Sequence, residues 1–136
     1  MAKKKTWIEK LEEDKAPQVK RLDKDFADMP AGCMMLIANP KIIEEYVRNI
    51  GKGKRVSLKT LRTDLALEHR AEYTCPVTTG IFLRIVAEAN YEKWQQGSPL
   101  ESITPFWRVI DPNSSLAGKL SFGRDFLEEQ IQNELD

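Results

Sequence analysis

Hydrophobic residues recur with a helical period in the middle of the chain. Between residues 42 and 50, apolar side chains lie three or four positions apart, which predicts a helix with one buried face. Asn39, followed by a proline, is a typical helix start, and Gly51 is a typical stop. Ser57 is suited to cap a second, shorter helix over 58–67, whose leucines share one face.

The same period returns after a polar loop. It predicts a longer helix that begins at Thr78 or Thr79, either of which can act as the N-cap, and that stops at Gly97. A closing helix is expected after Gly123, with its apolar side over 126–131. The pattern therefore predicts a chain that is mainly helical.

Other apolar segments lack the helical period. Residues 34–37 are a short apolar run, which fits a strand or a buried extended segment. Residues 104–110 are rich in aromatic and β-branched side chains, as strands are, and residues 111–115 have the composition of a turn. We expect residues 116–122 to return as a second strand and to complete a small hairpin.

The order of these elements predicts the fold class. Residues 1–30 are expected to form a weakly ordered N-terminal arm, and residues 31–136 a single domain. Three helices followed by a β wing are typical of a winged helix-turn-helix, so we expect a mainly α (α+β) domain of that kind. In that fold one helix enters a DNA groove with its N-terminus, which would bring Thr78, Thr79 and Arg84 near nucleic acid.

The charge of the chain is balanced overall but unevenly distributed. The 136 residues include 21 Lys and Arg against 21 Asp and Glu, and neutrality alone argues against a general polyanion-binding protein. Counted by segment, residues 1–24 carry +3, residues 41–70 carry +4 and residues 101–136 carry −4. The basic side chains near the first predicted turn form either a solvated face or a set of phosphate contacts. They are Lys52, Lys54, Arg55, Lys59 and Arg62.

The scarcity of some residue types excludes several functions. A single His removes most zinc, triad and His-relay chemistry, and two Cys form no disulfide framework, so we expect no metal and no cofactor. The longest apolar run, residues 34–38, is far shorter than the ~20 residues that span a bilayer. The basic N-terminal residues are not followed by an apolar stretch, so they do not form a secretory signal. We therefore expect a cytoplasmic protein with no membrane partner.

Two parts of the chain resemble a known family. Residues 42–57, which read Ile-Ile-Glu-Glu-Tyr-Val-Arg-Asn-Ile-Gly-Lys-Gly-Lys-Arg-Val-Ser, resemble the opening of the DNA-binding domain of O6-alkylguanine-DNA alkyltransferases. Residues 104–110, Thr-Pro-Phe-Trp-Arg-Val-Ile, are similar to the active-site stretch of that family, usually Pro-Cys-His-Arg-Val. Residues 118–129 resemble the Gly- and Lys-bearing loop and the closing helix that follow it.

The differences from the family concern its chemistry. The Cys that accepts the alkyl group corresponds to Phe106, which has no ionisable group, and the His that activates it corresponds to Trp107. The carboxylate that completes the relay falls near Glu129 or Gln130. Alkyl transfer at this site is therefore not expected.

The remaining similarity is closest to alkyltransferase-like proteins, which carry another residue in place of the Cys. The resemblance implies binding of duplexes with alkylated guanine, extrusion of the base into a pocket, and signalling of the lesion to repair proteins. Two of the family's DNA contacts are changed here. Its Tyr after the Val-Ser step corresponds to Leu58, and its intercalating Arg falls at Val77 or Thr78.

The leading hypothesis is a non-catalytic DNA-binding protein of the alkyltransferase-like kind. An extruded base would lie beside Phe106 and Trp107, which we expect on opposite faces of a strand. The residues expected to contact DNA are Lys52, Lys54, Arg55, Ser57, Lys59, Arg62, Thr78, Thr79 and Arg84. The residues expected around the base are Pro105, Phe106, Trp107 and Arg108.

Two other hypotheses remain. One is a protein-interaction or structural adaptor on the same fold that has lost DNA binding, which the acidic last helix and the missing Tyr and Arg favour. The other is a residual thiol enzyme that uses Cys75, although we expect Cys75 to be a buried, inert thiol. We expect Cys33 in the core and His69 in solvent.

Overall fold

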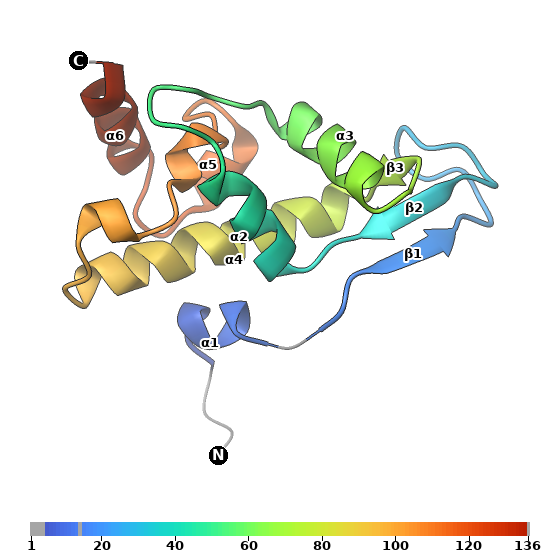
Figure 1. The fold of residues 1–136 in the computed structure, drawn as a ribbon, viewed down its shortest axis with the longest axis horizontal. Helices are drawn as coiled ribbons and strands as arrows, with labels where there is room; N and C mark the ends of the chain where they lie inside the picture. Colours follow the sequence, from blue (N-terminus) through green and yellow to red (C-terminus); the bar gives the residue numbers. More distant parts are fainter. Residues whose placement is uncertain (1–4, 14, 136) are drawn as a thin grey trace.

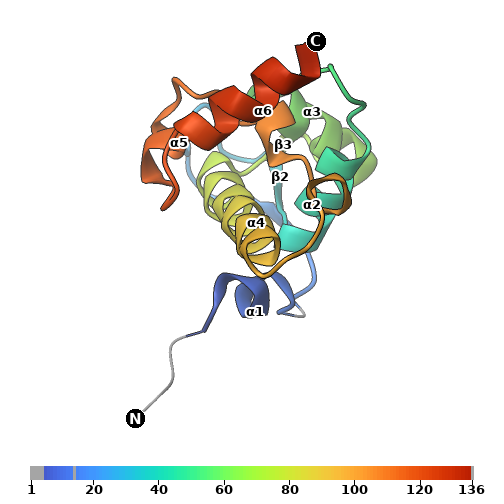
Figure 2. The same ribbon diagram turned by 90° about the vertical axis from the view of Figure 1, so that its left-hand side faces the viewer.

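The longest helix, α4 (Pro76–Gln95), forms the centre of the fold (Figure 1). The computed structural model describes residues 5–13 and 15–135 of the chain. Figure 2, which views α4 nearly end on, shows the other helices arranged around it. Residues 86–90 of α4 are accordingly all buried, although two of them are polar.

Two of the predicted helices and their caps are confirmed. Helix α2 (Pro40–Arg48) follows Asn39, whose side chain accepts a hydrogen bond from the backbone amide three residues later at 2.8 Å. Helix α3 (Leu58–Glu68) follows Ser57, whose hydroxyl accepts a bond from the equivalent amide at 3.1 Å. Each cap satisfies an amide that the first helical turn leaves without a partner.

Helix α4 begins earlier than the sequence pattern predicts. Its N-cap is Cys75, and Pro76 is its first residue, so the prediction of Thr78 or Thr79 as the cap is wrong. Proline suits the first helical position because its φ is already helical and it has no amide that needs a partner. The helix ends two residues before Gly97, close to the predicted stop.

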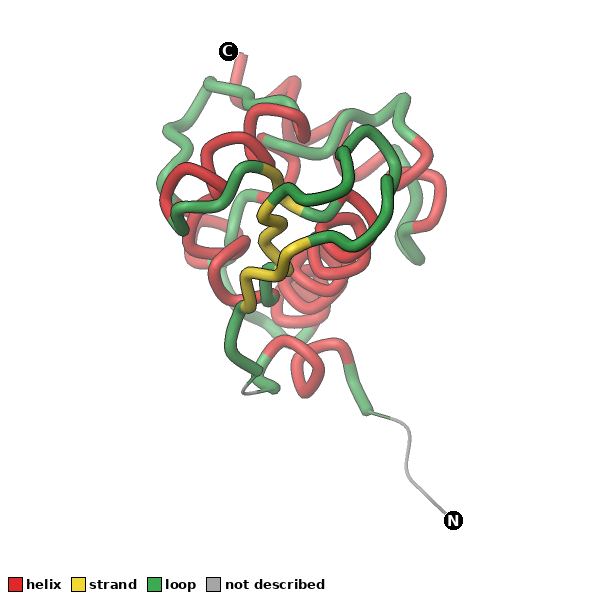
Figure 3. The backbone as a smooth tube through the Cα atoms, turned by 90° about the vertical axis from the view of Figure 1, so that its right-hand side faces the viewer, coloured by secondary structure: helices red, strands yellow, loops and turns green. Residues whose placement is uncertain are grey.

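A three-stranded sheet adjoins the N-terminal end of α4 (Figures 1 and 3). The apolar run 34–37 forms its central strand, β2 (Met34–Ile37). Strand β1 (Gln18–Arg21) pairs with β2 in antiparallel orientation, and β3 (Tyr73–Thr74) pairs with it in parallel. The amide of Cys75 donates to the carbonyl of Leu36 at 2.8 Å and ties the start of α4 to the sheet.

The part of residues 1–30 that the structure describes contains more regular structure than the pattern predicts. Besides β1, it forms α1 (Trp7–Leu11), which packs against α4 and buries Leu11 completely. A capping box joins Thr6 and Glu9 at the start of α1, because each side chain accepts a hydrogen bond from the backbone amide of the other residue.

The hairpin predicted over residues 104–122 is wrong. This segment forms a 3-10 helix, η2 (Phe106–Arg108), and a short helix, α5 (Ser115–Lys119). Most of its backbone hydrogen bonds are local, as where the amide of Ile110 donates to the carbonyl of Phe106 at 3.1 Å, although the carbonyl of Arg108 accepts from the amide of Val56 at 2.9 Å. The aromatic and β-branched side chains are frequent here because they enter the core, and none of them pairs in a sheet.

The closing helix predicted after Gly123 is confirmed as α6 (Asp125–Leu135). A 3-10 turn, η1 (Leu100–Ser102), lies between α4 and η2. The chain is thus a small α+β domain in which helices dominate, as the pattern predicts. In the part of the chain that the structure describes, no helix combines the length and the apolar character needed to cross a bilayer.

Candidate nucleic-acid interface

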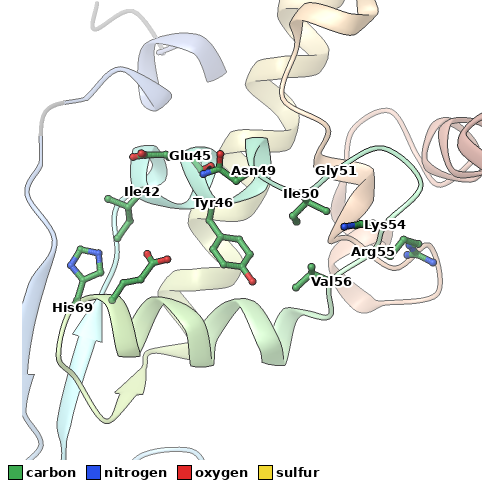
Figure 4. A pocket seen from close by; sticks show the side chains of 11 residues that line it. Ile42, Glu45, Tyr46, Asn49, Ile50, Gly51, Lys54, Arg55, Val56 and His69 are labelled. Carbon is green, nitrogen blue, oxygen red and sulfur yellow. Dashed lines mark hydrogen bonds between the residues drawn. The ribbon is translucent and has the colours of Figure 1, made fainter.

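A groove of about 780 Å³ runs between α2 and α3, and we call it the α2–α3 groove (Figure 4). Its apolar lining consists of Ile42, Tyr46, Ile50 and Val56. The hydroxyl of Tyr46 donates to a carboxylate oxygen of Asp64 on α3 at 2.5 Å, which fixes the ring across the groove. Burial and this hydrogen bond raise the pKa of Tyr46, because both disfavour the phenolate.

The α2–α3 groove adjoins a second hollow of about 460 Å³, which we call the α3–α5 hollow. The two are neighbours, because Arg55 and Val56 line both of them. Aliphatic side chains and serine hydroxyls make up most of the remaining lining. These residues are Ser57, Leu58, Leu83, Val109, Ile110, Asp111, Ser114, Ser115 and Leu116.

The α3–α5 hollow in turn adjoins a shallow hollow along the first half of α4. It has a volume of about 660 Å³, and we call it the α4 face. Leu58, Ser115 and Leu116 line both. Val77 and Ile81 are 54% and 53% exposed and lie together on this face. The cationic residues that line the α4 face are Lys10, Arg84 and Lys119.

Most of the cations predicted to contact phosphates lie at the surface near the start of α3. Lys52, Lys54, Arg55 and Lys59 are all exposed, and Arg55 lines both the groove and the hollow. Ser57 lines the hollow while its hydroxyl caps α3. The positive end of the α3 dipole therefore lies among these cations.

Arg62 is separated from the other cations and largely buried. Its Nε donates to the carbonyl of Thr74 at 3.0 Å, and its guanidinium lies 3.4 Å from a carboxylate oxygen of Asp28. The hydroxyl of Thr74 donates back to the carbonyl of Arg62 at 2.7 Å. Arg62 thus joins α3 to β3, and its Nε and one terminal nitrogen bind partners within the protein.

Of the three α4 residues predicted near nucleic acid, only Arg84 lines the α4 face. Thr79 is fully buried, and its hydroxyl donates to the backbone carbonyl four residues earlier at 2.6 Å. Thr78 is half-buried. The guanidinium of Arg84 lies 5.1 Å from the centre of the Trp7 ring, and its Nε lies 3.6 Å from Glu88.

Phe106 and Trp107 do not lie on opposite faces of a strand, because η2 turns both rings into the core. Phe106 is 0% exposed and Trp107 is 4% exposed. The Phe106 ring lies 5.6 Å from Phe122 and 5.7 Å from Phe126, measured between ring centres. These rings stabilise the packing between η2 and α6, and Phe106 leaves no room for a base at its position.

Arg108 and Trp107 bind the same carboxylate on the closing helix. The Nε1 of Trp107 donates to Glu134 at 2.9 Å, and the guanidinium of Arg108 donates to Glu134 at 2.6 Å. Arg108 also donates to the carbonyl of Ile50 at 2.7 Å. The Arg108 and Glu134 side chains are only 14% and 11% exposed, so this ion pair links η2, the turn after α2 and α6 inside the protein. Pro105, next to this pair, is half-buried.

The sequence reasoning missed Glu134. A carboxylate was expected near Glu129 or Gln130, and Glu134 lies one helical turn beyond Gln130, so the α-helical period was the available signal. Burial alone would raise the pKa of Glu134, but the hydrogen bonds from Arg108 and Trp107 outweigh it and hold the pKa below its usual value.

The remaining candidate residues are the two cysteines and the single histidine. Cys75 and Cys33 are buried as predicted, whereas His69 is half-buried at the end of α3. Burial raises the pKa of the Cys33 thiol. Among the described residues, no three His, Cys, Asp or Glu side chains are grouped closely enough to hold a metal ion. Comparison of this chain with known protein families, with curated proteins and with solved structures finds no match.

Proposed function

We propose that this protein is a non-catalytic DNA-binding protein of the alkyltransferase-like kind, which binds duplex DNA and transfers no alkyl group. The observation that carries the proposal is that the α3–α5 hollow and the α4 face adjoin at the start of α3, where both are lined by Leu58, Ser115 and Leu116. Four cations line this combined surface, and Asp111 is the one carboxylate among its lining residues in the described part of the chain. The four cations are Lys10, Arg55, Arg84 and Lys119.

Phosphate contacts supply the sequence-independent part of such binding. Lys52, Lys54, Arg55 and Lys59 are exposed within one short stretch that leads into α3. Their charges add to the positive end of the α3 dipole. A duplex placed there would meet a concentration of positive charge that the neutral total of the chain conceals.

The α3–α5 hollow is the proposed receptor for an extruded base. Its volume of about 460 Å³ falls in the range of roughly 300–1,000 Å³ that is usual for small-molecule sites. Because Phe106 and Trp107 pack in the core, the base would meet the aliphatic side chains of Leu58 and Leu116 and the hydroxyl of Ser115. Aliphatic contacts suit the alkyl group of a damaged base, and such a base is easier to unstack.

The residues around the hollow support binding without alkyl transfer. Phe106 and Trp107 replace the reactive pair of the family that the sequence resembles. In the described structure, neither a Cys nor a His lines the α3–α5 hollow or the α4 face. A serine hydroxyl without a hydrogen bond to a basic side chain is a weak nucleophile, and the hydroxyl of Ser114 donates to the backbone carbonyl of Asp111, not to its carboxylate.

A protein-interaction adaptor is the alternative function. The exposed side chains of Val77 and Ile81 favour it, because an apolar contact surface suits a protein partner better than a phosphate backbone. The thiol-enzyme hypothesis has weaker support, because Cys75 is buried and lines neither the hollow nor the α4 face.

Reversing two exposed cations in the turn before α3 should weaken DNA binding strongly. The double variant Lys54→Glu, Arg55→Glu is expected to bind a 20-base-pair duplex at least about tenfold more weakly than the original protein. The slope of log affinity against log salt concentration should become less steep by the amount that about two phosphate contacts contribute. Fluorescence anisotropy across a salt series measures both quantities.

A matched control separates local contacts from total charge. Lys20 and Arg21 are exposed on β1 and line neither the hollow nor the α4 face, so Lys20→Glu, Arg21→Glu makes the same change in net charge elsewhere. We expect it to change duplex affinity by less than about threefold. Equal losses in the two double variants would mean that no specific surface binds DNA.

A further inference from the structure

The α2–α3 groove carries opposite charges at its two ends. Figure 4 shows Lys54 and Arg55 at one end, His69 at the other and Tyr46 between them. Glu68, the last residue of α3, and Glu45, one position before Tyr46 on α2, also line the groove. The groove is therefore cationic where α3 begins and anionic where α3 ends.

The charges at both ends are free to meet a ligand. Lys54, Arg55, Glu45 and Glu68 are all exposed, and in the described part of the chain none of them forms an ion pair. The α3 dipole has the same direction, since its positive end lies beside the cations. The 11 residues of α3 separate the ends by about 16 Å, at 1.5 Å per residue.

We propose that the α2–α3 groove binds an extended polypeptide segment of a partner protein. An acidic residue of the segment would meet Lys54 and Arg55, a basic residue would meet Glu45 and Glu68, and apolar side chains between them would pack on Tyr46. The groove shares Lys54 and Arg55 with the proposed DNA surface, but Tyr46, Glu45 and Glu68 belong to the groove alone and the ligand class is different, so the inference does not require the proposed function.

The charge pattern favours a peptide over a nucleic acid strand in this groove. A strand that followed the groove would bring phosphates to Glu45 and Glu68, where like charges repel. A peptide with both signs complements both ends. Tyr46 adds a fixed aromatic surface at the middle, because its hydroxyl is held by Asp64.

The length of the groove defines the spacing of the charged residues. An extended chain advances about 3.3 Å per residue, and alternate side chains point the same way. Two charged residues six positions apart therefore lie about 20 Å apart on one face, enough to reach both ends with two apolar residues between them. The heptapeptide Glu-Ser-Leu-Ser-Leu-Ser-Lys meets this requirement.

Binding of that peptide tests the inference. We expect fluorescein-labelled Glu-Ser-Leu-Ser-Leu-Ser-Lys to bind about tenfold more tightly than Ser-Ser-Leu-Ser-Leu-Ser-Ser, which corresponds to two modest charge pairs. In amide NMR spectra, shifts should concentrate at Tyr46, Ile50 and Val56. Failure of the charged peptide to bind, binding equal to that of the neutral peptide, or shifts elsewhere would overturn the inference.

A charge reversal at the anionic end distinguishes this site from DNA binding. The variant Glu45→Lys, Glu68→Lys should lose the preference for the mixed-charge peptide and gain one for Glu-Ser-Leu-Ser-Leu-Ser-Glu, while its affinity for duplex DNA should not fall. Glu128→Lys, Glu129→Lys, on the exposed side of α6, is the matched control and should keep the original preference. An unchanged peptide preference in Glu45→Lys, Glu68→Lys would contradict the proposal whatever the outcome for DNA.

Discussion

Replacing Phe106 with Ala is expected to lower the free energy of unfolding by about 3–5 kcal/mol. The side chain is fully buried, and its ring contacts the rings of Trp107, Phe122 and Phe126. Truncation would remove this apolar surface and leave a cavity between η2 and α6, which the surrounding helices cannot fill without moving. Urea denaturation followed by circular dichroism measures the loss.

Phe26→Ala is the matched control for this loss, because Phe26 is exposed. We expect that variant to stay within about 1 kcal/mol of the original protein. If Phe106→Ala kept nearly full stability and instead weakened duplex binding, the ring would belong to a ligand pocket, and the packing described for η2 would be wrong.

Replacing Glu134 with Ala is expected to cost about 3 kcal/mol of stability. The change leaves the Arg108 guanidinium without its carboxylate and the Trp107 ring nitrogen without an acceptor, in a place with little access to water. Glu129→Ala removes an exposed carboxylate from the same helix and should change stability by less than about 0.5 kcal/mol. Comparable losses in the two variants would show that the buried ion pair does not hold α6 in place.

The same ion pair predicts a dependence of stability on pH. Because the folded protein lowers the pKa of Glu134 below 4.5, the ionised form stabilises the fold above that pH, and this contribution is lost as the pH falls through the lowered pKa. Glu134→Gln cannot titrate. The difference in unfolding free energy between the original protein and this variant should therefore shrink on acidification, and a difference that stayed constant would contradict the assignment.

The helices that the sequence predicts best depend on local signals. Asn39 and Ser57 cap α2 and α3 within one turn, and the leucines of α3 share a face, so nearby residues contain the necessary information. The capping box of Thr6 and Glu9 was equally readable and marks α1. The actual start of α4 at Pro76 also had a local signal, the preset φ of proline.

The errors arise where side chains meet partners that are distant in the sequence. Phe106 and Trp107 have the composition of a strand, but their rings pack on the closing helix, and composition cannot separate these two causes of burial. Arg62 belongs to the same basic segment as the surface cations, but Thr74 and Asp28, which are distant in the sequence, bind its side chain. By contrast, the exposure of the basic residues in the turn before α3 could be predicted from the local sequence, because charged side chains in a turn remain in solvent.

The central claim is that the surface around the start of α3 binds duplex DNA and receives a damaged base. The most direct measurement is fluorescence anisotropy of the full chain with two matched duplexes, one plain and one containing O6-methylguanine, across a salt series. We expect binding to both at low salt, tighter binding to the alkylated duplex, and a log–log salt slope of about −3 to −4 for some four phosphate contacts. Absence of binding to either duplex at the lowest salt would contradict the claim.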